Sequence, residues 1–354
     1  MDLNDAPAGT PRRIDLRSNT VTRPGAAMRQ AMAKAEVGDD VLDGDPTVGR
    51  LEARVAQLLG MDWALYVPTG TMGNQIALGL VTTPGTELYL DANSHIISTE
   101  MAGTALFWGV QIRPVAPSGL TIDAADVKRA LRPAGAHTPR ASALAIENTH
   151  NGAGGVVTTL AGMAALAALA RDHGLKVHLD GARLWNAAAA LGCAVADLAA
   201  TADTAMVSFS KGLGAPVGAC VAGRGIPVAL ARESRRRFGG GMRQSGIIAA
   251  AALFGLDHHL ARLPDDHAKA RRFAAAVDGK GGARVVPPDT NIVMIDLAPG
   301  GDAVALAAAI AADQVLVSAW LPTRLRAVMH LDASDDDVAQ AAHVVARQLE
   351  RSVA

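Results

Sequence analysis

The 354-residue sequence contains little cysteine and no long apolar segment. Its two cysteines, Cys193 and Cys220, stand in apolar stretches without CxxC spacing, so we expect two buried thiols rather than a disulfide framework or a zinc site. No run of about 18 apolar residues predicts a membrane span, and the first residues lack the apolar core of a signal peptide. We therefore expect a cytoplasmic protein that has no membrane partner and holds no metal ion.

The sequence also lacks an extended stretch of one charge. Its formal net charge is −1, and its densest positive run is Arg235–Arg237, with Arg232 and Arg243 nearby. Nucleic-acid binding needs a charged face, which this short run does not supply. The run could bind one or two phosphates, or it could form a solvated helix face. The composition, 50% hydrophobic and 19% charged, is typical of a packed globular enzyme.

Short strands and helices alternate through the first two thirds of the chain. This alternation predicts an α/β layer with a mainly parallel sheet. After about residue 255 the pattern changes to that of a smaller α+β domain. We expect a flexible tail at 1–12, a large domain with an N-terminal arm at 13–254, and a small C-terminal domain at 255–354. The expected strands of the large domain are 64–67, 87–90, 141–147, 176–179, 204–208 and 218–222.

Polar or glycine-rich residues follow four of these strands, in the segments PTGTMGN, NTHNG, DGAR and SKGLG. Ligands of open α/β sheets bind beyond the carboxyl ends of the strands, so four such segments suggest one site. Each has a simpler interpretation. Gly70 and Thr71 could form an anion pocket or an ordinary helix cap, and Asp180 could pair with a cation or cap the next helix. His150 could be a turn histidine. Arg183 at a helix start opposes the helix dipole, which favours a functional role.

Lysine is scarce, and one lysine has an unusual place. Of the six lysines only Lys211 stands at a strand end, among Ser208, Ser210 and Gly212. A desolvated lysine has a lowered pKa and can form a Schiff base with an aldehyde. Together with an anion pocket and an aspartate able to hold a pyridinium nitrogen, this lysine points to pyridoxal 5′-phosphate (PLP) as cofactor.

The chain resembles the low-specificity L-threonine aldolases, which are PLP enzymes with the aspartate-aminotransferase-type fold (fold type I). The resemblance spans nearly the whole chain and is specific as a set. Its segments are IDLRSNTVTRP (14–24), VGDD…GDPTV (37–48), PTGTMGNQIAL (68–78), ENTHNG (147–152), HLDGARLWNA (178–187), SKGLGAPVG (210–218), GGGMRQSGI (239–247) and MHLD (329–332).

The resemblance implies a role for each matching residue. Lys211 would carry the cofactor as a Schiff base, Asp180 would pair with the pyridine nitrogen, and His95 would stack on the ring. His150 would lie near the β-hydroxyl of the substrate and is our first candidate for the catalytic base, with His95 second. The remaining implied contacts are Gly70, Thr71, Ser208, Arg183 and Arg236 for the cofactor, and Ser18, Arg183, Arg326 and Arg243 for the substrate.

The implied reaction is the reversible retro-aldol cleavage of L-threonine or L-allo-threonine to glycine and acetaldehyde. The implied assembly is a dimer or tetramer in which Arg236 and Arg243 reach a neighbouring subunit's site. Two departures concern the pocket for the β-substituent: Leu42 stands where relatives commonly have tyrosine, and residues 96–100 lack aromatic side chains. Two alternatives remain: a related PLP lyase, such as a phenylserine aldolase or a β-eliminating lyase, and a non-catalytic binding protein on the same fold.

Overall fold

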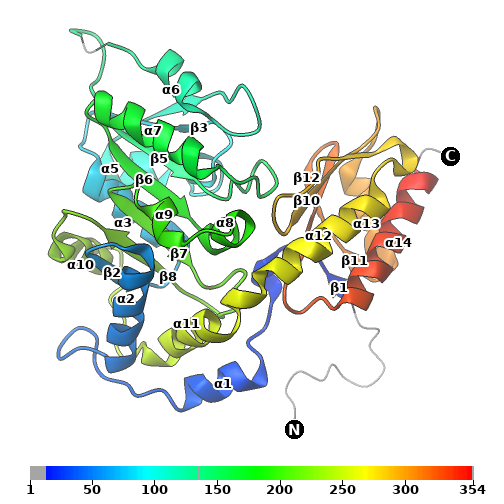
Figure 1. The fold of residues 1–354 in the computed structure, drawn as a ribbon, viewed down its shortest axis with the longest axis horizontal. Coiled ribbons are helices and arrows are strands. Elements are labelled where there is room, and N and C mark those ends of the chain that lie inside the picture. The colour runs from blue at the N-terminus through cyan, green and yellow to red at the C-terminus, as the bar shows by residue number, and fades with distance from the viewer. Residues whose placement is uncertain (1–12, 134, 353–354) are drawn as a thin grey trace. The chain divides into compact units, whose positions relative to one another are not determined.

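The computed structural model describes residues 13–133 and 135–352 (Figure 1). The expected flexible tail, residues 1–12, lies outside the described residues. The chain divides into two compact units. The large unit comprises Arg23–Leu263, and the small unit combines residues 13–22 with residues 264–352.

A seven-stranded sheet forms the centre of the large unit. Only β8 runs antiparallel to its neighbours, and the other strands run parallel to one another. Most of the strand residues are buried, as expected for a parallel sheet with helices on both faces. In spatial order the strands are β2 (Trp63–Val67), β8 (Ala219–Gly223), β7 (Thr204–Ser208), β6 (Lys176–Gly181), β5 (Ala141–Glu147), β3 (Glu87–Asp91) and β4 (Gln111–Val115).

The helices of the large unit cover both faces of this sheet. Alternate residues of β2 show this arrangement, because Tyr66 packs into the cluster that contains α2 and α7, whereas Leu65 and Val67 pack with α3. The helices are α1 (Ala26–Ala33), α2 (Pro46–Leu59), α3 (Gly70–Val81), α4 (His95–Ser98), α5 (Gly103–Trp108), α6 (Ala124–Ala130), α7 (Leu160–Asp172), α8 (Leu184–Leu191), α9 (Val195–Ala199), α10 (Val228–Arg237) and α11 (Gly246–His258).

The strand register brings six connecting segments to one edge of the sheet. Glu147 pairs with Asp180 across β5 and β6, and Ala219 pairs with both Val67 and Ser208. The segments that follow β2, β3, β4, β5, β6 and β7 therefore all begin at this edge. They include the four polar segments singled out in the sequence.

The small unit is built on a four-stranded antiparallel sheet. One helix of this unit, α14, begins with a capping box between Ser334 and Asp337, and its apolar face joins the small unit's core. The sheet order is β12 (Ser318–Leu321), β13 (Arg324–Val328), β10 (Ile292–Asp296) and β9 (Arg284–Val285), and the longer helices are α12 (Leu263–Val277), α13 (Ala303–Ala312) and α14 (Asp335–Arg351).

The contacts divide the chain differently from the expected boundaries of 13–254 and 255–354. The N-terminal strand β1 (Ile14–Asp15) pairs in parallel with β11 (Val315–Leu316), so the start of the expected arm belongs to the small unit. At the other boundary, α11 packs on α1 and α2 and continues to His258, which keeps residues 255–263 in the large unit. Long-range strand pairing and helix packing decide both boundaries, and composition does not reveal either.

None of the helices in the described part of the chain combines the length and the apolar character that crossing a bilayer requires.

Candidate active site

Lys211 lies three residues after the end of β7, at the edge where the connecting segments meet. The turn that carries it is closed by the Phe209 N–H, which donates to the Gly218 carbonyl, and by the Ala215 N–H, which donates to the Phe209 carbonyl. Gly218 has a φ of +112°, and a Cβ there would meet the Tyr66 hydroxyl at 2.4 Å, so only glycine fits. Burial lowers the pKa of Lys211 to about 8, and the positive charge of Arg183 adds to this effect. A larger fraction of its amine is therefore neutral at physiological pH than in an exposed lysine.

Asp180 lies at the end of β6 and is almost fully buried. Its carboxylate accepts one hydrogen bond from Asn74 Nδ2 at 2.8 Å and one from the Ala182 N–H at 3.1 Å. The next helix, α8, begins at Leu184 with Arg183 as its N-cap residue, so Asp180 does not cap it. Both groups that donate to Asp180 in the described structure are neutral. A cationic ring nitrogen would supply the positive charge that a buried carboxylate needs, and this donor set therefore fits a pyridinium.

The start of α3 was expected to form either an anion pocket or an ordinary helix cap. Thr69 is its N-cap residue and accepts a hydrogen bond from the Met72 N–H at 3.1 Å, while Gly70 and Thr71 occupy the first turn, where backbone N–H groups have no partner within the helix. A Cβ at Gly73 would meet Met206 of β7 at 2.7 Å, so this glycine lets the helix start lie directly on the strand that leads to Lys211. This arrangement fits a phosphate group.

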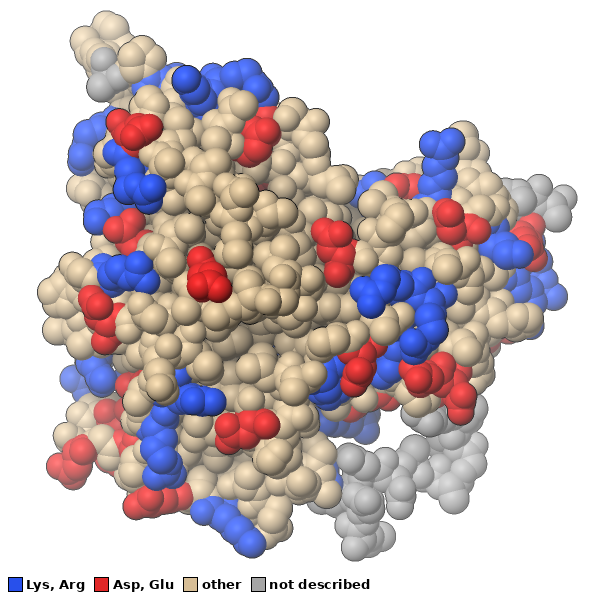
Figure 2. Space-filling view, in the orientation of Figure 1, with Lys and Arg blue, Asp and Glu red and all other residues tan. Residues whose placement is uncertain are grey.

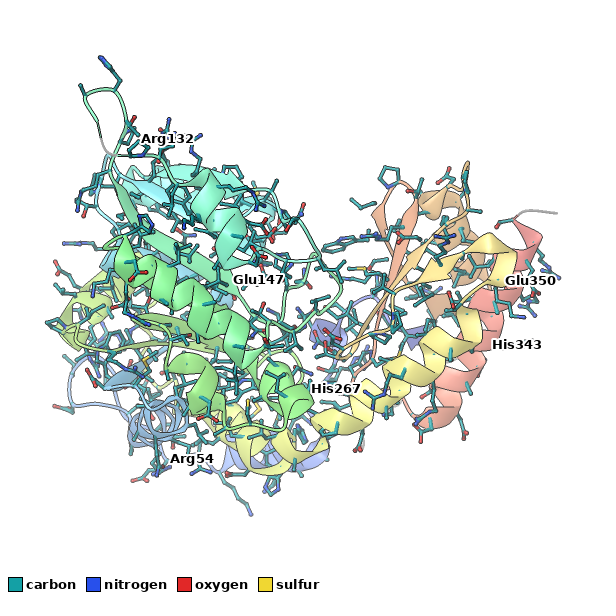
Figure 3. All side chains as sticks on the ribbon, turned by 45° about the horizontal axis from the view of Figure 1, so that its top comes forward. Arg54, Arg132, Glu147, His267, His343 and Glu350 are labelled. Atoms are coloured by element: carbon teal, nitrogen blue, oxygen red, sulfur yellow. The ribbon has the colours of Figure 1, made fainter. Side chains whose placement is uncertain are left out.

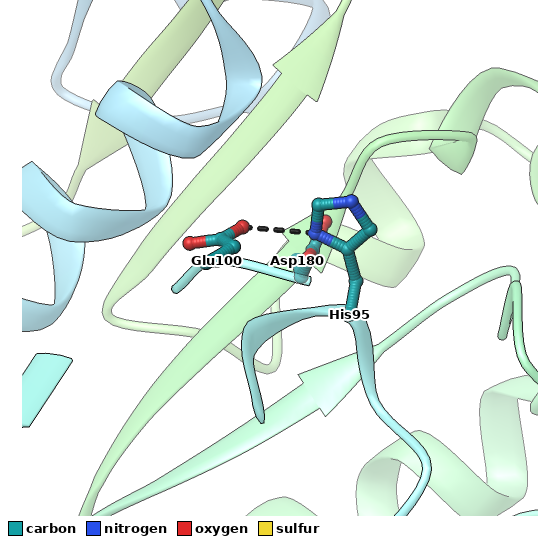
Figure 4. Close-up of side chains that lie close together, drawn as sticks. All are labelled: His95, Glu100 and Asp180. Carbon is teal, nitrogen blue, oxygen red and sulfur yellow. Dashed lines mark hydrogen bonds and ion pairs between the residues drawn. The ribbon is translucent and has the colours of Figure 1, made fainter. Parts of the chain in front are cut away.

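His95 begins α4, just beyond β3, and it is held by two carboxylates. Its Nδ1 lies 2.9 Å from Glu100 Oε1, and its backbone N–H donates to Glu147 Oε2 at 2.6 Å. The hydrogen bond with Glu100 raises the pKa of His95. Figure 4 shows this bond and Asp180 next to it.

One atom from each of His95, Glu100 and Asp180 lies within 4.8 Å of the other two, a spacing that could suit a metal ion. Hydrogen bonds already occupy these groups. Asn74 Nδ2 donates to Glu100 Oε1 at 2.7 Å and to Asp180 at 2.8 Å, and Gln75 Nε2 donates to Glu100 Oε2 at 2.8 Å. Amide donors therefore contact both carboxylates of this group, and Glu100 also contacts His95.

His150 lies in the turn after β5, and its side chain is buried. Its Nδ1 accepts a hydrogen bond from the Ala153 N–H at 3.1 Å, so in the neutral ring Nε2 carries the proton, and this atom lies 3.5 Å from Asp91 Oδ1. Burial alone would lower the pKa of His150, but the carboxylates of Asp91 and Glu147 outweigh it and raise the value. Both ring nitrogens thus face protein groups, whereas the His95 side chain remains 31% exposed.

Arg183 is nearly buried, and its Nη1 donates to Asn151 Oδ1 at 3.0 Å. The Asn151 N–H in turn donates at 2.8 Å to Glu147, which Figure 3 labels at the end of β5. Burial raises the pKa of Glu147. Ser208, the last residue of β7, is buried, and its hydroxyl lies 3.3 Å from that of Ser210. The large unit therefore brings together Lys211, Asp180, Arg183, His95, His150, Ser208, Gly70 and Thr71.

Two further expected site residues of the large unit lie on its surface. Arg236 is exposed at the end of α10, and Arg243 is exposed in the following loop, 3.3 Å from Asp39. The buried member of the arginine run is Arg235, which lies 2.8 Å from Asp40 and donates to the Tyr66 carbonyl. Part of this run therefore has a structural role.

Ser18 and Arg326 belong to the small unit, where they lie close together. Arg326 Nη2 donates to the carbonyl of Arg17, the residue before Ser18, at 3.1 Å. The guanidinium of Arg326 lies 4.2 Å from the ring centre of Trp320, which the sequence analysis did not single out. Burial lowers the pKa of Arg326 to about 10, so its side chain stays charged at neutral pH.

The sequence analysis also missed Glu100, Asn74 and His178, which connect to Asp180 through hydrogen bonds. Two signals were available. Asn74 lies one helical turn after Gly70, in the quoted PTGTMGN segment, and His178 precedes Asp180 by two residues, so both point to the same face of the strand. Glu100 had no comparable signal, because its partners come from distant segments.

The sequence model of the family described as beta-eliminating lyase matches residues 15–299. The chain belongs to this family. Within the beta-eliminating lyase family it is 39% identical over 335 residues to low-specificity L-threonine aldolase 1 of Arabidopsis thaliana, covering 92% of this chain and 94% of that one. It is 38% identical over 330 residues to the low specificity L-threonine aldolase of Escherichia coli strain K12, covering 93% and 97%.

A threonine aldolase from Leishmania major has a similar solved structure, with a TM-score of 0.81 at 19% identity, covering 95% of this chain and 99% of that one. This likeness confirms the expected fold.

Proposed function

We propose that the protein is a PLP-dependent aldolase that cleaves L-threonine and L-allo-threonine to glycine and acetaldehyde, and that Lys211 holds the cofactor. The observation that carries this proposal is the placement of Lys211, whose pKa is lowered to about 8, at the same sheet edge as buried Asp180 and the glycine-rich start of α3. The similarity to two named L-threonine aldolases supports the reaction.

When bound, the cofactor supplies an electron-withdrawing ring that accepts the electron pair released as the Cα–Cβ bond breaks. The residues of this chain have the supporting roles. Asp180 keeps a proton on the ring nitrogen by offering it a buried carboxylate. The N–H groups of Gly70 and Thr71 hold the phosphate, and Ser208 and Arg183 make further contacts with the cofactor. His95, whose ring is held by Glu100, stacks on the cofactor.

Substrate binding is assigned to Arg326 and Ser18, with Arg183 as a further contact. Arg326 pairs with the substrate carboxylate, and Trp320 fixes the plane of its guanidinium. Fixing the carboxylate limits rotation about the bond to be broken and so selects it for cleavage. The proton of the β-hydroxyl passes to His150 or to a water molecule that His150 orients, with His95 as the second candidate for the base.

We further propose a homo-oligomer, dimer or tetramer, in the cytoplasm, in which Arg236 and Arg243 contribute to a neighbouring subunit's site. Three apolar side chains in and next to α5 support an interface: Met101, Leu106 and Phe107 are 90%, 75% and 50% exposed. An exposed apolar group of this kind is unusual unless a partner covers it. Positive and negative side chains are mixed on the face that Figure 2 shows. This face therefore differs from the continuous positive surface that nucleic-acid binding requires. Light scattering of the purified protein tests the assembly, and a monomer would contradict it.

The deciding experiment is the visible spectrum of the purified protein, before and after addition of glycine. We expect a band of bound cofactor, a new band at longer wavelength with glycine, and acetaldehyde from threonine and allo-threonine. Benzaldehyde from phenylserine as the preferred product, or pyruvate, would replace the proposal by one of the related lyases. A featureless spectrum after added PLP would favour a binding protein on this fold.

The matched variant is Lys211→Ala, with the exposed Lys128→Ala as control. Turnover should fall by at least about 10³-fold in the first variant, because the amine that holds the cofactor is gone, and stay unchanged in the second. Normal turnover by Lys211→Ala would remove the central claim.

A further inference from the structure

Three buried polar side chains lie behind Asp180 and Glu100 in the large unit. They are Asn74 on α3, His178 on β6 and Thr204 on β7, and the accessible surface of each is 0%. A buried polar group costs free energy unless it finds a hydrogen-bond partner. Each of the three has one, and together their bonds form a continuous chain that ends at the two carboxylates.

The direction of every bond in this chain follows from its two ends. The Asn74 nitrogen donates to both Asp180 and Glu100, so its Oδ1 faces His178. His178 Nε2, 3.1 Å from that oxygen, therefore carries the proton. Its Nδ1 is then an acceptor, and Thr204 donates its hydroxyl to it at 3.1 Å. Burial lowers the pKa of His178 to about 4, which agrees with a neutral ring that has one proton.

This hydrogen-bond network offsets the repulsion between the carboxylates of Asp180 and Glu100. Two buried carboxylates close to one another repel, and such a pair commonly takes up a proton that one of them retains. The Asn74 amide offers one N–H to each carboxylate, at 2.7 Å to Glu100 and 2.8 Å to Asp180. Both carboxylates can then remain anions. Asp180 must be an anion to pair with a protonated ring nitrogen, and Glu100 must be one to hold the proton of His95.

We propose that Asn74 is a positioning residue that keeps Asp180 and Glu100 as two separate anions, and that His178 and Thr204 fix the direction of its amide. The inference rests on the proposed function, because the anion at Asp180 matters only if a cofactor ring nitrogen faces it. Asn74 acts through Asp180 on the cofactor and through Glu100 on His95.

Two substitutions of His178 separate this role from simple packing. The amide nitrogen of glutamine reaches about as far as Nε2 of histidine, so His178→Gln keeps the donor to Asn74. His178→Asn is the shorter amide and loses that donor. In the purified holoprotein we expect His178→Asn to lower kcat about 10- to 100-fold, with KM for threonine changed less than about twofold, because an Asn74 amide that is no longer held can turn and lose a hydrogen bond to a charged carboxylate. His178→Gln should stay within about threefold of wild type.

The same proteins provide a readout that does not depend on turnover. In His178→Asn the visible band of the bound cofactor should titrate at a pH different from that in wild type, because the charge at Asp180 changes, whereas in His178→Gln it should not. Thermal unfolding of both variants checks that they fold. Equal losses in the two variants with an unchanged titration of the band would overturn the proposal.

In a second test, ¹⁵N NMR of the histidine rings measures which nitrogen of His178 carries the proton. In wild type, His178 should be a neutral ring with its proton on Nε2 from about pH 5.5 upward, since a buried ring that charges only at much lower pH keeps one form. In Asn74→Asp, a carboxylate replaces the amide, and His178 should become charged at neutral pH. A proton on Nδ1 of His178 in wild type would reverse the direction of these hydrogen bonds and overturn the inference.

Two outcomes distinguish the role of Asn74 from the proposed function. If wild type binds PLP and cleaves threonine while His178→Asn and Asn74→Asp behave like wild type, the network has no role and the proposed function stands. If wild type never binds PLP, the proposed function fails, and the inference, which depends on it, fails with it.

Discussion

The two units of this protein gather their charged groups by different means. In the large unit, neighbouring parallel strands place Glu147 and Asp180 opposite each other, so the polar ends of the strands come together as a consequence of sheet topology. In the small unit, Arg326 is held by the carbonyl of Arg17, a residue 309 positions away in the sequence. The arrangement in the large unit follows from a recurrent fold. The arrangement in the small unit depends on one short N-terminal segment, which pairs with β11 and so brings the Arg17 carbonyl to Arg326.

The units also differ in the chemistry that they offer. The large unit has several buried carboxylates and histidines that share hydrogen bonds, which suits control of protons and of a cofactor's charge. In the small unit the guanidinium of Arg326 stays charged and lies next to the Trp320 ring, which suits the binding of an anion. We therefore expect substitutions in the large unit to affect the rate and substitutions in the small unit to affect binding.

The largest effect of this kind is expected for Asp180→Asn. The change keeps the shape of the side chain but removes the negative charge, so the cofactor ring becomes a weaker electron acceptor. We expect kcat for threonine to fall on the order of 10²- to 10³-fold, with little change in KM. Steady-state kinetics measure the two constants. A change in KM alone would show that Asp180 does not pair with the ring nitrogen.

Next in size is Arg326→Ala, which removes the cation of the small unit. KM should rise on the order of 10²-fold for threonine, allo-threonine and phenylserine alike, because all three substrates share the carboxylate. Arg324→Ala is a matched control, since that arginine pairs with Asp296 instead. A loss confined to one β-substituent would mean that Arg326 contacts the side chain of the substrate.

A smaller effect is expected for Trp320→Leu. The substitution removes the ring under Arg326 but leaves its charge in place, so KM should rise about two- to tenfold, in keeping with one cation–π contact. The kinetics of the double variant Trp320→Leu, Arg326→Ala test the coupling. Simple multiplication of the two single effects would show that Trp320 acts independently of the guanidinium.

The last expected effect is on stability rather than on turnover: a pH dependence that comes from Lys211. Its pKa falls from 10.5 to about 8 on folding, so between these values the unfolded chain binds a proton that the folded chain does not. The free energy of unfolding of the cofactor-free protein should therefore rise with pH in this window. Denaturant unfolding of wild type, Lys211→Met and the control Lys128→Met checks this. An equal rise in Lys211→Met would assign it to another group.

Several parts of the molecule were predictable from the sequence because local chemistry reveals them. Alternating strands and helices predicted the parallel sheet, and glycine and polar residues at the strand ends predicted the edge at which Lys211 and Asp180 meet. Strand β4 was not predicted, because Arg113 and Pro114 interrupt its apolar pattern at the edge of the sheet. Strand β1 has only two residues, too few to show a period.

The sequence by itself determined the kind of chemistry: a lysine and an aspartate at strand ends, a glycine-rich helix start, and arginines for anions. The tertiary structure decided which groups share protons. Glu100 stood in a segment singled out only for its missing aromatic residues, yet it joins His95 to α3, and Asn74 links it to Asp180. The kind of chemistry can be inferred from the sequence because the reactivity of a side chain depends mainly on its type and its close neighbours. Hydrogen-bond partners do not, because they depend on which distant segments burial brings within 3 Å.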